Sequence, residues 1–295
     1  MNNYEVFRRL WAGQIWPLVR VVPPKTPQGV SNLFQHVARL IEFQPSFITC
    51  TYGAGGSTQE LTLEIVARVH REFQLPVATH LTCVGRTVDQ LREYLRTALN
   101  LNVENVVALR GDPPRGDTAF RPVDGGFGHA NELVALIHGE FPEFGIAVAG
   151  YPEKHQEAQN LEIDLANLKR KVDSGADVVI TQLFYNNDDF FRFRDCCHTL
   201  GIRLPIVPGL LPVTNFAQIK RITSLCGAQL PPSFVRRLEA AGDVAEDQFK
   251  IGVEFATQQT QALVDASVPG IHFYVLNRSE AAAEVLISVD LANRC

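Results

Sequence analysis

Residues 106–114 read Val-Val-Ala-Leu-Arg-Gly-Asp-Pro-Pro, and this stretch decides the fold. Four apolar residues are too few for a helix, so they predict a strand that is buried on both faces. The two prolines end the strand because proline has no amide hydrogen to donate to a sheet. Arg110 and Asp112 therefore stand at a strand end, and Gly111 between them lets the backbone approach a bulky group. Parallel α/β enzymes carry their chemistry at this edge.

Strand-like and helix-like patterns alternate along the rest of the chain. The expected strands are residues 18–22, 47–52, 77–83, 103–109, 146–149, 177–184, 205–211 and 270–276. The expected helices are 30–42, a helix capped by Ser57 or Thr58, 88–99 capped by Thr87, 130–139, 161–172, 189–200, 214–225, 231–240, 247–266 and 279–289. This alternation, without hairpin turns, predicts a parallel sheet.

Eight such units in 295 residues predict a (β/α)8 TIM barrel. We expect a single catalytic domain over residues 1–295, with a short N-terminal helix at about 3–12. An open, doubly wound sheet is the alternative architecture.

Composition limits the class of protein. The chain is 46% hydrophobic and 20% charged, as in ordinary globular enzymes, and its net charge of −5 argues against a nucleic-acid partner. No run reaches the roughly 18 apolar residues that a membrane span needs. The six cysteines show no CxxC spacing, so we expect buried free thiols in a reducing cytoplasm. No metal site is expected, since Glu153 and His155 have no third ligand at helical spacing.

Polar side chains follow most of the predicted strands. They are Thr51 and Tyr52, His80 and Thr82, Arg110 and Asp112, Tyr151 and His155, Thr181 and Gln182, and Asn277 and Arg278. A single strand-end threonine is as often a loop cap as a ligand contact. His80 alone is as typical of a hydrogen-bonded core histidine as of a cofactor contact. Together they predict an active-site face. The glycine-rich turn at 53–56 is only weak support for a phosphate site, and there is no P-loop or GxGxxG motif.

Seven motifs, in order, resemble methylenetetrahydrofolate reductase of the compact bacterial type, which consists of the catalytic barrel only. They are residues 51–54 (TYGA), 80–83 (HLTC), 108–114 (ALRGDPP), 151–155 (YPEKH), 180–184 (ITQLF), 208–213 (PGLLPV) and 272–278 (HFYVLNR). The resemblance extends from about residue 18 to 290.

The resemblance implies an FAD-dependent oxidoreductase. NADH or NADPH would give a hydride to the flavin, which would pass it in a ping-pong cycle to 5,10-methylenetetrahydrofolate, giving 5-methyltetrahydrofolate. The family's place is one-carbon metabolism, where it supplies methyl groups for methionine. The resemblance also implies a cytoplasmic homo-oligomer, a dimer or a tetramer, without a nucleic-acid or membrane partner.

The resemblance also assigns residues. FAD contacts are expected from Thr51, His80, Leu109, Arg110, Gly111, Asp112, Ala130, Tyr151, His155, Asp164 and Lys171. Catalytic roles beside the reacting rings are expected for Asp112 and Gln182. Folate contacts are expected from Gln182, from Phe216 by stacking, and from Arg278.

One position departs from the family. The family's first strand reads Phe-Glu-Phe-Phe-Pro-Pro-Lys, whereas residues 19–25 read Val-Arg-Val-Val-Pro-Pro-Lys. Arg20 therefore stands where the family has its proposed general acid, and arginine gives up no proton at accessible pH. General acid catalysis is worth about 10²- to 10⁴-fold. A charge inside a barrel needs a partner, and we expect Arg20 to pair with Asp112.

Three functional interpretations follow. The chain is a working reductase that uses another acid or a water, or a flavoprotein that oxidises NAD(P)H but reduces folate poorly because of Arg20. The third is a non-catalytic FAD- or folate-binding module, which the complete set of flavin residues disfavours. A separate alternative concerns Arg20 itself: the first strand is shifted in register or altered by engineering.

Overall fold

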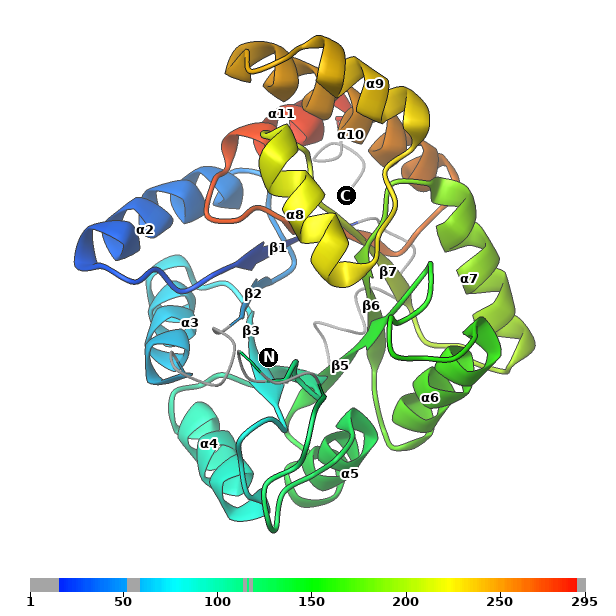
Figure 1. Ribbon diagram of the computed structural model, residues 1–295. Coiled ribbons are helices and arrows are strands. Elements are labelled where there is room, and N and C mark those ends of the chain that lie inside the picture. Colours follow the sequence, from blue (N-terminus) through cyan, green and yellow to red (C-terminus); the bar gives the residue numbers. More distant parts are fainter. Residues whose placement is uncertain (1–15, 52–58, 114–115, 117–118, 291–295) are drawn as a thin grey trace.

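The computed structural model describes residues 16–51, 59–113, 116 and 119–290. Eight parallel strands follow one another around a closed barrel (Figure 1). They are β1 (Trp16–Val21), β2 (Ile48–Cys50), β3 (Val77–Thr82), β4 (Asn105–Leu109), β5 (Gly145–Gly150), β6 (Val178–Leu183), β7 (Ile206–Leu210) and β8 (Gly270–Tyr274). Pairing of β1 with β8 closes the sheet. The predicted (β/α)8 barrel is confirmed, and the alternative of an open sheet is wrong.

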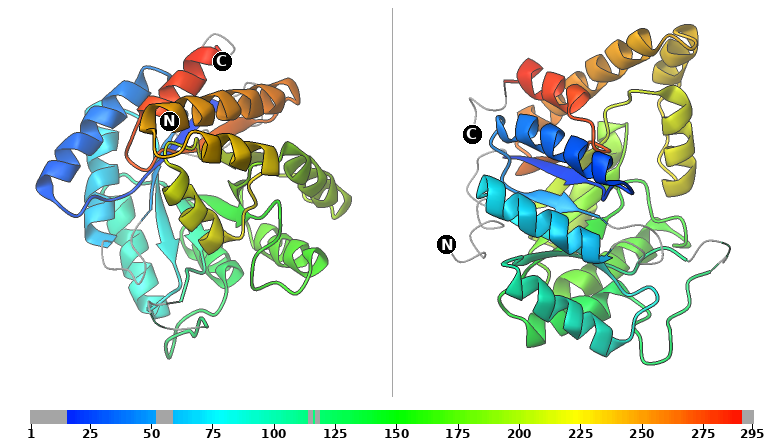
Figure 2. Two further views of the ribbon diagram at one scale, coloured as in Figure 1. Left: turned by 45° about the horizontal axis from the view of Figure 1, so that its top comes forward. Right: turned by 90° about the vertical axis from the view of Figure 1, so that its left-hand side faces the viewer.

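Helices form a ring outside the strands. They are α2 (Pro27–Ile41), α3 (Gln59–Phe73), α4 (Val88–Asn100), α5 (Ala130–Glu140), α6 (Leu161–Asp173), α7 (Asn187–Thr199), α8 (Phe216–Cys226), α9 (Pro232–Ala240), α10 (Ala245–Asp265) and α11 (Glu280–Ser288). Three of them, α8 to α10, follow β7 and lie together at one side of the molecule (Figures 1 and 2). The predicted helix at 3–12 and the caps Ser57 and Thr58 lie outside the described residues.

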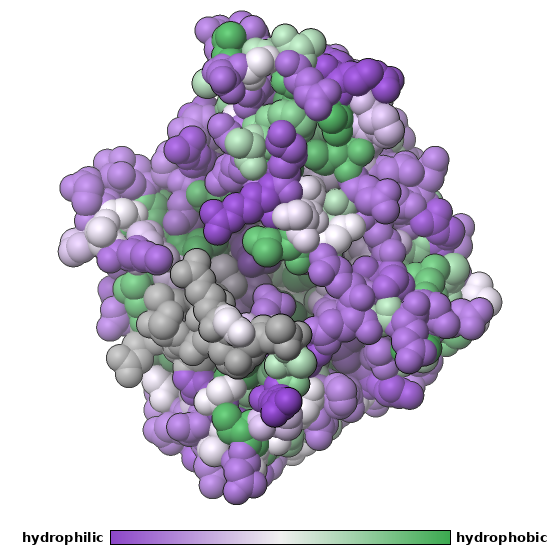
Figure 3. Space-filling model, viewed as in Figure 1, coloured by the Kyte–Doolittle hydropathy of each residue, from purple (hydrophilic) through white to green (hydrophobic). Residues whose placement is uncertain are grey.

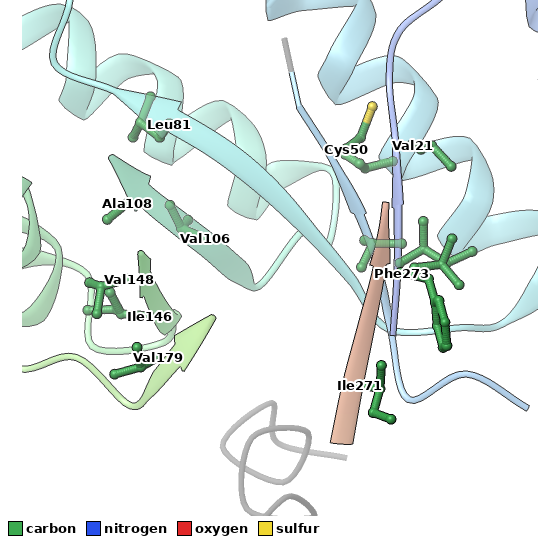
Figure 4. Close-up of a cluster of buried hydrophobic side chains, with 14 of the residues drawn as sticks. Val21, Cys50, Leu81, Val106, Ala108, Ile146, Val148, Val179, Ile271 and Phe273 are labelled. Atoms are coloured by element: carbon green, nitrogen blue, oxygen red, sulfur yellow. The ribbon is translucent and has the colours of Figure 1, made fainter. Parts of the chain in front are cut away.

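The fourth strand is buried on both faces, as the sequence predicts. Val107 packs into the barrel interior, whereas Val106 and Ala108 belong to the outer core between strands and helices. Figure 4 shows the outer core, where Val106 and Ala108 lie near Ile146. Since successive side chains of a strand point to opposite faces, one strand supplies both cores.

The start of α4 shows how local sequence sets an element boundary. Thr87 accepts a hydrogen bond from the backbone N–H of Gln90, and the Gln90 side chain accepts one from the backbone of Thr87. This reciprocal capping box satisfies two amide donors that the first helical turn cannot pair. The predicted Thr87 cap is confirmed.

The barrel interior changes from apolar to polar along the strands. At the amino side, Leu18 packs in a fully buried inner cluster together with Phe47 and Ala78. Two residues further along their strands, Arg20 follows Leu18 and His80 follows Ala78 on the same inward face. The inner cluster therefore forms the apolar bottom of a polar site.

The cysteines and the helices agree with a globular core. Cys50, Cys83 and Cys197 are buried, Cys196 and Cys226 are half-buried, and all five are free thiols. Across residues 16–290, leaving aside the undescribed gaps, no group of His, Cys, Asp and Glu could hold a metal ion. No helix of the described chain is long and apolar enough to cross a membrane.

Candidate active site at the carboxyl ends of the strands

A pocket of about 290 Å³ opens among the carboxyl ends of the strands. Its lining residues are Arg20, Thr51, His80, Thr82, Val84, Val107, Leu109, Arg110, Gly111, Asp112, Ala149, Tyr151, His155, Ile180, Gln182, His272 and Tyr274. The rim of the molecule seen along the barrel is largely hydrophilic (Figure 3). We call this cavity the mouth pocket. Most of the polar residues that the sequence places after its strands meet here.

A second pocket, of about 430 Å³, continues the mouth pocket toward α5 and α6. The two share Leu109, Arg110, Ala149, Tyr151 and His155, so they form one elongated trough. The outer part, which we call the α6 pocket, has a small excess of positive charge. Its lining contains three basic residues, Arg110, Arg170 and Lys171, and two acidic ones, Glu157 and Asp164. Such a trough suits a long ligand with a ring at one end and phosphates at the other.

A third pocket, of about 510 Å³, lies between β7, α8, β8 and α11. It touches the mouth pocket through Tyr274, which lines both. Arg278 and Gln218 supply its polar groups, and Ile222 lies on its apolar wall. We call it the α8 pocket.

The structure brings most of the predicted site residues together. All eleven residues expected to contact a flavin line the mouth pocket or the α6 pocket. Gln182 lines the mouth pocket and Arg278 the α8 pocket. Phe216 lies elsewhere: it is 8% exposed, packs in the cluster that contains Phe234, and lines none of the three pockets.

Arg20 points into the mouth pocket but does not form the expected ion pair. Within the described part of the chain, no carboxylate, including that of Asp112, lies within 4 Å of its guanidinium. Its guanidinium carbon instead lies 4.9 Å from the ring centre of Tyr274. The expected pairing is wrong because Arg20 sits within β1, whereas Asp112 follows the end of β4 and is exposed.

The buried titratable groups around Arg20 are held neutral. Burial and then the charge of Arg20 lower the pKa of His272 to about 3. The same two causes, with a contribution from His272, hold the pKa of His80 well below its usual value. Burial raises the pKa values of Cys50 and Tyr274, with Arg20 opposing both shifts. Arg20 is therefore a cation among neutral neighbours.

The α6 pocket contains a lysine with a shifted pKa. Burial lowers the pKa of Lys171 to about 8, with the nearby Asp164 opposing the shift. The Lys171 ammonium donates a hydrogen bond to the carbonyl of Ala149. Asp164 accepts a bond of 2.9 Å from the backbone N–H of His155, which fixes the loop that follows β5. Lys171 can therefore meet an anion in a partly desolvated setting.

Arg110 is already paired at the junction of the two pockets. Its guanidinium donates two hydrogen bonds, of 2.5 and 2.8 Å, to the carboxylate of Glu157, and it lies 4.9 Å from the ring centre of Phe120. This bidentate pair raises the pKa of Arg110 and lowers that of Glu157. The pair holds the guanidinium in a fixed orientation at the wall of the trough.

Two strand-end residues have structural roles. Asn277 binds the backbone of Val22 in both directions, accepting from its N–H at 2.8 Å and donating to its carbonyl at 2.6 Å. The Thr181 hydroxyl accepts a hydrogen bond from the N–H of Gly209. The alternative that a strand-end polar residue is only a cap therefore applies to these two.

A family profile described as "Methylenetetrahydrofolate reductase" matches residues 7–290. The chain belongs to the methylenetetrahydrofolate reductase family. The match covers all three pockets and most of the chain, so the resemblance in the seven motifs is confirmed.

Individual members of this family are similar over nearly the same span. A protein from Arabidopsis thaliana named "Methylenetetrahydrofolate reductase (NADH) 1" is 39% identical over 279 residues, covering 91% of this chain and 47% of its own length. The "5,10-methylenetetrahydrofolate reductase" of Escherichia coli is 37% identical over 268 residues, covering 91% of this chain and 88% of its own. The chain thus spans about half the length of the plant relatives and most of the bacterial one.

Solved structures show the same fold at low identity. One is an uncharacterized protein from Clostridium thermocellum, described as binding two copies of 5-methyl-5,6,7,8-tetrahydrofolic acid, with a TM-score of 0.62 and 13% identity. The match covers 98% of this chain and 99% of that protein. At this identity the likeness supports the fold alone.

Sequence reasoning missed several residues of the site, among them Asn131, Asn167 and Arg170 in the α6 pocket. Tyr274 and His272 line the mouth pocket, and Gln218 lines the α8 pocket. The sequence does indicate His272 and Tyr274. They flank Phe273 on β8, and since Phe273 points outward, both must point into the barrel. Gln218 lies in the first turn of α8, where an amide is typical of an ordinary surface residue.

Proposed function

We propose that this chain is an FAD-dependent reductase that transfers a hydride from NADH or NADPH to 5,10-methylenetetrahydrofolate. The observation that carries the proposal is the continuous trough formed by the mouth pocket and the α6 pocket, lined by every residue that the family resemblance assigns to the flavin. Family membership supports the reaction class. We also propose that the protein is cytoplasmic and that it forms a homo-oligomer.

The donor set of the trough fits a flavin dinucleotide. Lys171 and Arg170 supply cations for a pyrophosphate, and two amide side chains, Asn131 and Asn167, line the same pocket. Arg110 is held at the wall of this pocket by its ion pair with Glu157. The mouth pocket has a mixed apolar and hydrogen-bonding wall that suits a flat heterocycle. Bound there, the flavin would supply the hydride chemistry, while the protein binds and orients it.

The remaining residues have positioning roles in this proposal. Gln182 lines the mouth pocket from β6 and is placed to hydrogen-bond a ring amide of the folate or the nicotinamide. Asp112 follows the end of β4, so it would lie beside the reacting rings and favour a positively charged substrate. Arg278 lies in the adjoining α8 pocket and suits a carboxylate of the folate tail.

Arg20 favours a second candidate function. Its guanidinium lines the pocket where the family has a glutamate, and its neighbours in the barrel are neutral. The chain would then oxidise NAD(P)H through the flavin but reduce folate slowly, because no proton is available at this position and a cationic folate species is repelled.

Anaerobic absorption spectroscopy of the flavin tests both functions. NADH is added first, and the flavin bands are expected to bleach; methylenetetrahydrofolate is added second. Rapid return of the bands identifies a working methylenetetrahydrofolate reductase. Bleaching without return identifies the second function. A purified protein that neither carries nor binds FAD contradicts both, and NADPH in place of NADH decides the donor.

A further inference from the structure

The mouth pocket has a positive charge that no described residue of the chain neutralises. Arg20 contacts the ring of Tyr274, and the hydroxyl of that residue donates its own proton to the carbonyl of Thr181 at 2.8 Å. Tyr274 therefore gives Arg20 an aromatic face and an oxygen, but no negative charge. The other buried titratable groups close enough to respond to the charge of Arg20 are the imidazoles of His80 and His272 and the thiol of Cys50, and none supplies an anion.

The neighbouring imidazoles are also incompletely paired. His80 is 5% exposed and His272 is 2% exposed, and both line the mouth pocket. The Nδ1 atom of each ring has no hydrogen-bond partner in the described structure. His272 shares a hydrogen bond with the hydroxyl of Thr49 through Nε2, at 3.3 Å, and its ring packs edge-on against Tyr274. Buried polar groups are normally paired, so unpaired ones beside an unneutralised cation indicate a place prepared for a ligand.

We propose that Arg20 and the polar wall around it form a subsite for a planar carboxylate in the mouth pocket. A guanidinium presents two parallel N–H donors that match the two oxygens of a carboxylate. One charge on the ligand neutralises one charge in the pocket. Of the residues that form this subsite, only His80 is also an expected flavin contact, and the existence of the subsite does not depend on the proposed reductase activity.

The surroundings favour a carboxylate over a phosphate. A phosphate carries more charge and is usually met by several cations, but Arg110, the other arginine of the mouth pocket, is already bound at two points by Glu157. Asp112 lines the same pocket and opposes a second negative charge on the ligand. A small, singly charged and flat anion is thus the best match.

Isothermal titration calorimetry on the protein as purified tests the subsite, with acetate, benzoate and inorganic phosphate as probes at constant ionic strength. We expect saturable 1:1 binding of a carboxylate. Arg20→Gln should weaken this binding about ten- to a hundredfold, since a charge-assisted bidentate pair is lost. Arg20→Lys keeps the charge but loses the two parallel N–H donors, so it should bind the carboxylate with intermediate affinity. Arg236→Gln is the matched control, because it removes the same charge from an exposed position on α9.

The outcomes separate clearly. Equal affinity in wild type and Arg20→Gln, or equal weakening by Arg236→Gln, overturns the proposal. So does the absence of saturable carboxylate binding, or tighter binding of phosphate than of carboxylates. Thermal unfolding of each variant checks that it is folded. If Arg20→Gln does not fold, the weaker carboxylate binding expected of Arg20→Lys tests the proposal instead. Because the readout is heat of binding, failure here is distinguishable from failure of the reductase assay.

Discussion

Arg20 changes what a single position can contribute to catalysis. A carboxyl group at this point of β1 would be flanked by Tyr274, His80 and His272, and such burial tends to keep a carboxyl protonated near neutral pH. The guanidinium holds its charge permanently and donates hydrogen bonds only. In the proposed reductase, Arg20 in place of a glutamate would therefore remove an acid and add an electrostatic barrier to cationic substrates.

Restoring the carboxyl group should restore the folate step. We expect Arg20→Glu to increase the rate at which methylenetetrahydrofolate reoxidises the bleached flavin by about 10²-fold or more, the size of a general-acid contribution. The measurement is anaerobic stopped-flow absorbance. Arg20→Gln removes the charge but supplies no acid, so it should gain much less. Equal rates in Arg20→Glu and Arg20→Gln would show that the proton comes from elsewhere.

Lys171 should make flavin affinity depend on pH. Burial lowers its pKa to about 8, so the ammonium that attracts a phosphate is lost as the pH rises through that value. We expect the dissociation constant of FAD to increase by about tenfold between pH 7 and pH 9. FAD fluorescence titrations would measure it.

Two substitutions give the Lys171 prediction its controls. Lys171→Arg stays charged at pH 9, so the pH dependence should largely disappear. Lys169→Met removes a cation of the same helix that pairs with Asp173 outside the pocket, so it should bind FAD as wild type does. An unchanged pH dependence in Lys171→Arg would assign the titration to another group.

Elements were predictable because each strand and helix has its own local signal. The run of apolar residues gave β4, and Thr87 gave the start of α4. What the sequence could not provide is the direction of a side chain relative to residues far along the chain. Arg20 and Asp112 were expected to pair, yet they lie three strands apart around the barrel. Phe216 is predicted to contact a ligand, yet it is the first residue of α8 and packs in the cluster that contains Phe234.

The turn that ends β4 shows the same limit. Gly111 was expected to allow close approach of a bulky group, and its φ of +90° confirms a backbone shape that suits glycine. The nearby bulk, however, includes the chain's own Val84, whose side chain would lie 2.8 Å from an added Cβ atom. Sequence reveals the glycine, whereas only the fold reveals its neighbour.

We expect Gly111→Ala to lower the free energy of unfolding by more than about 1 kcal/mol, because alanine disfavours positive φ and the added methyl meets Val84. It should also weaken FAD binding by moving Arg110 and Asp112. Gly139→Ala, within α5 and with open space around it, should be neutral or stabilising by up to about 1 kcal/mol. Urea unfolding measures both, and a Gly111→Ala protein as stable as wild type would contradict the strain.

The polar site lies directly above the apolar inner cluster of the barrel, and this arrangement makes the free energy of unfolding depend on pH. The inner cluster excludes water below, so His80 and His272 are buried without a counter-charge. Each stays neutral in the folded protein at pH values where it would be protonated in the unfolded chain. The unfolded state then binds more protons, so stability must fall as the pH falls.

The pH window for this loss follows from the pKa values. For His272 it begins near the usual value of 6.5 and continues down to about 3, costing about 1.4 kcal/mol per pH unit within that range. His80 acts in the same direction. We expect His272→Gln to reduce the slope of unfolding free energy against pH by about one proton between pH 6 and 4. The exposed His198→Gln serves as the control. Comparing slopes rather than absolute stabilities removes the cost of the substitution itself, and equal slopes in the two variants would mean that His272 is charged in the folded barrel.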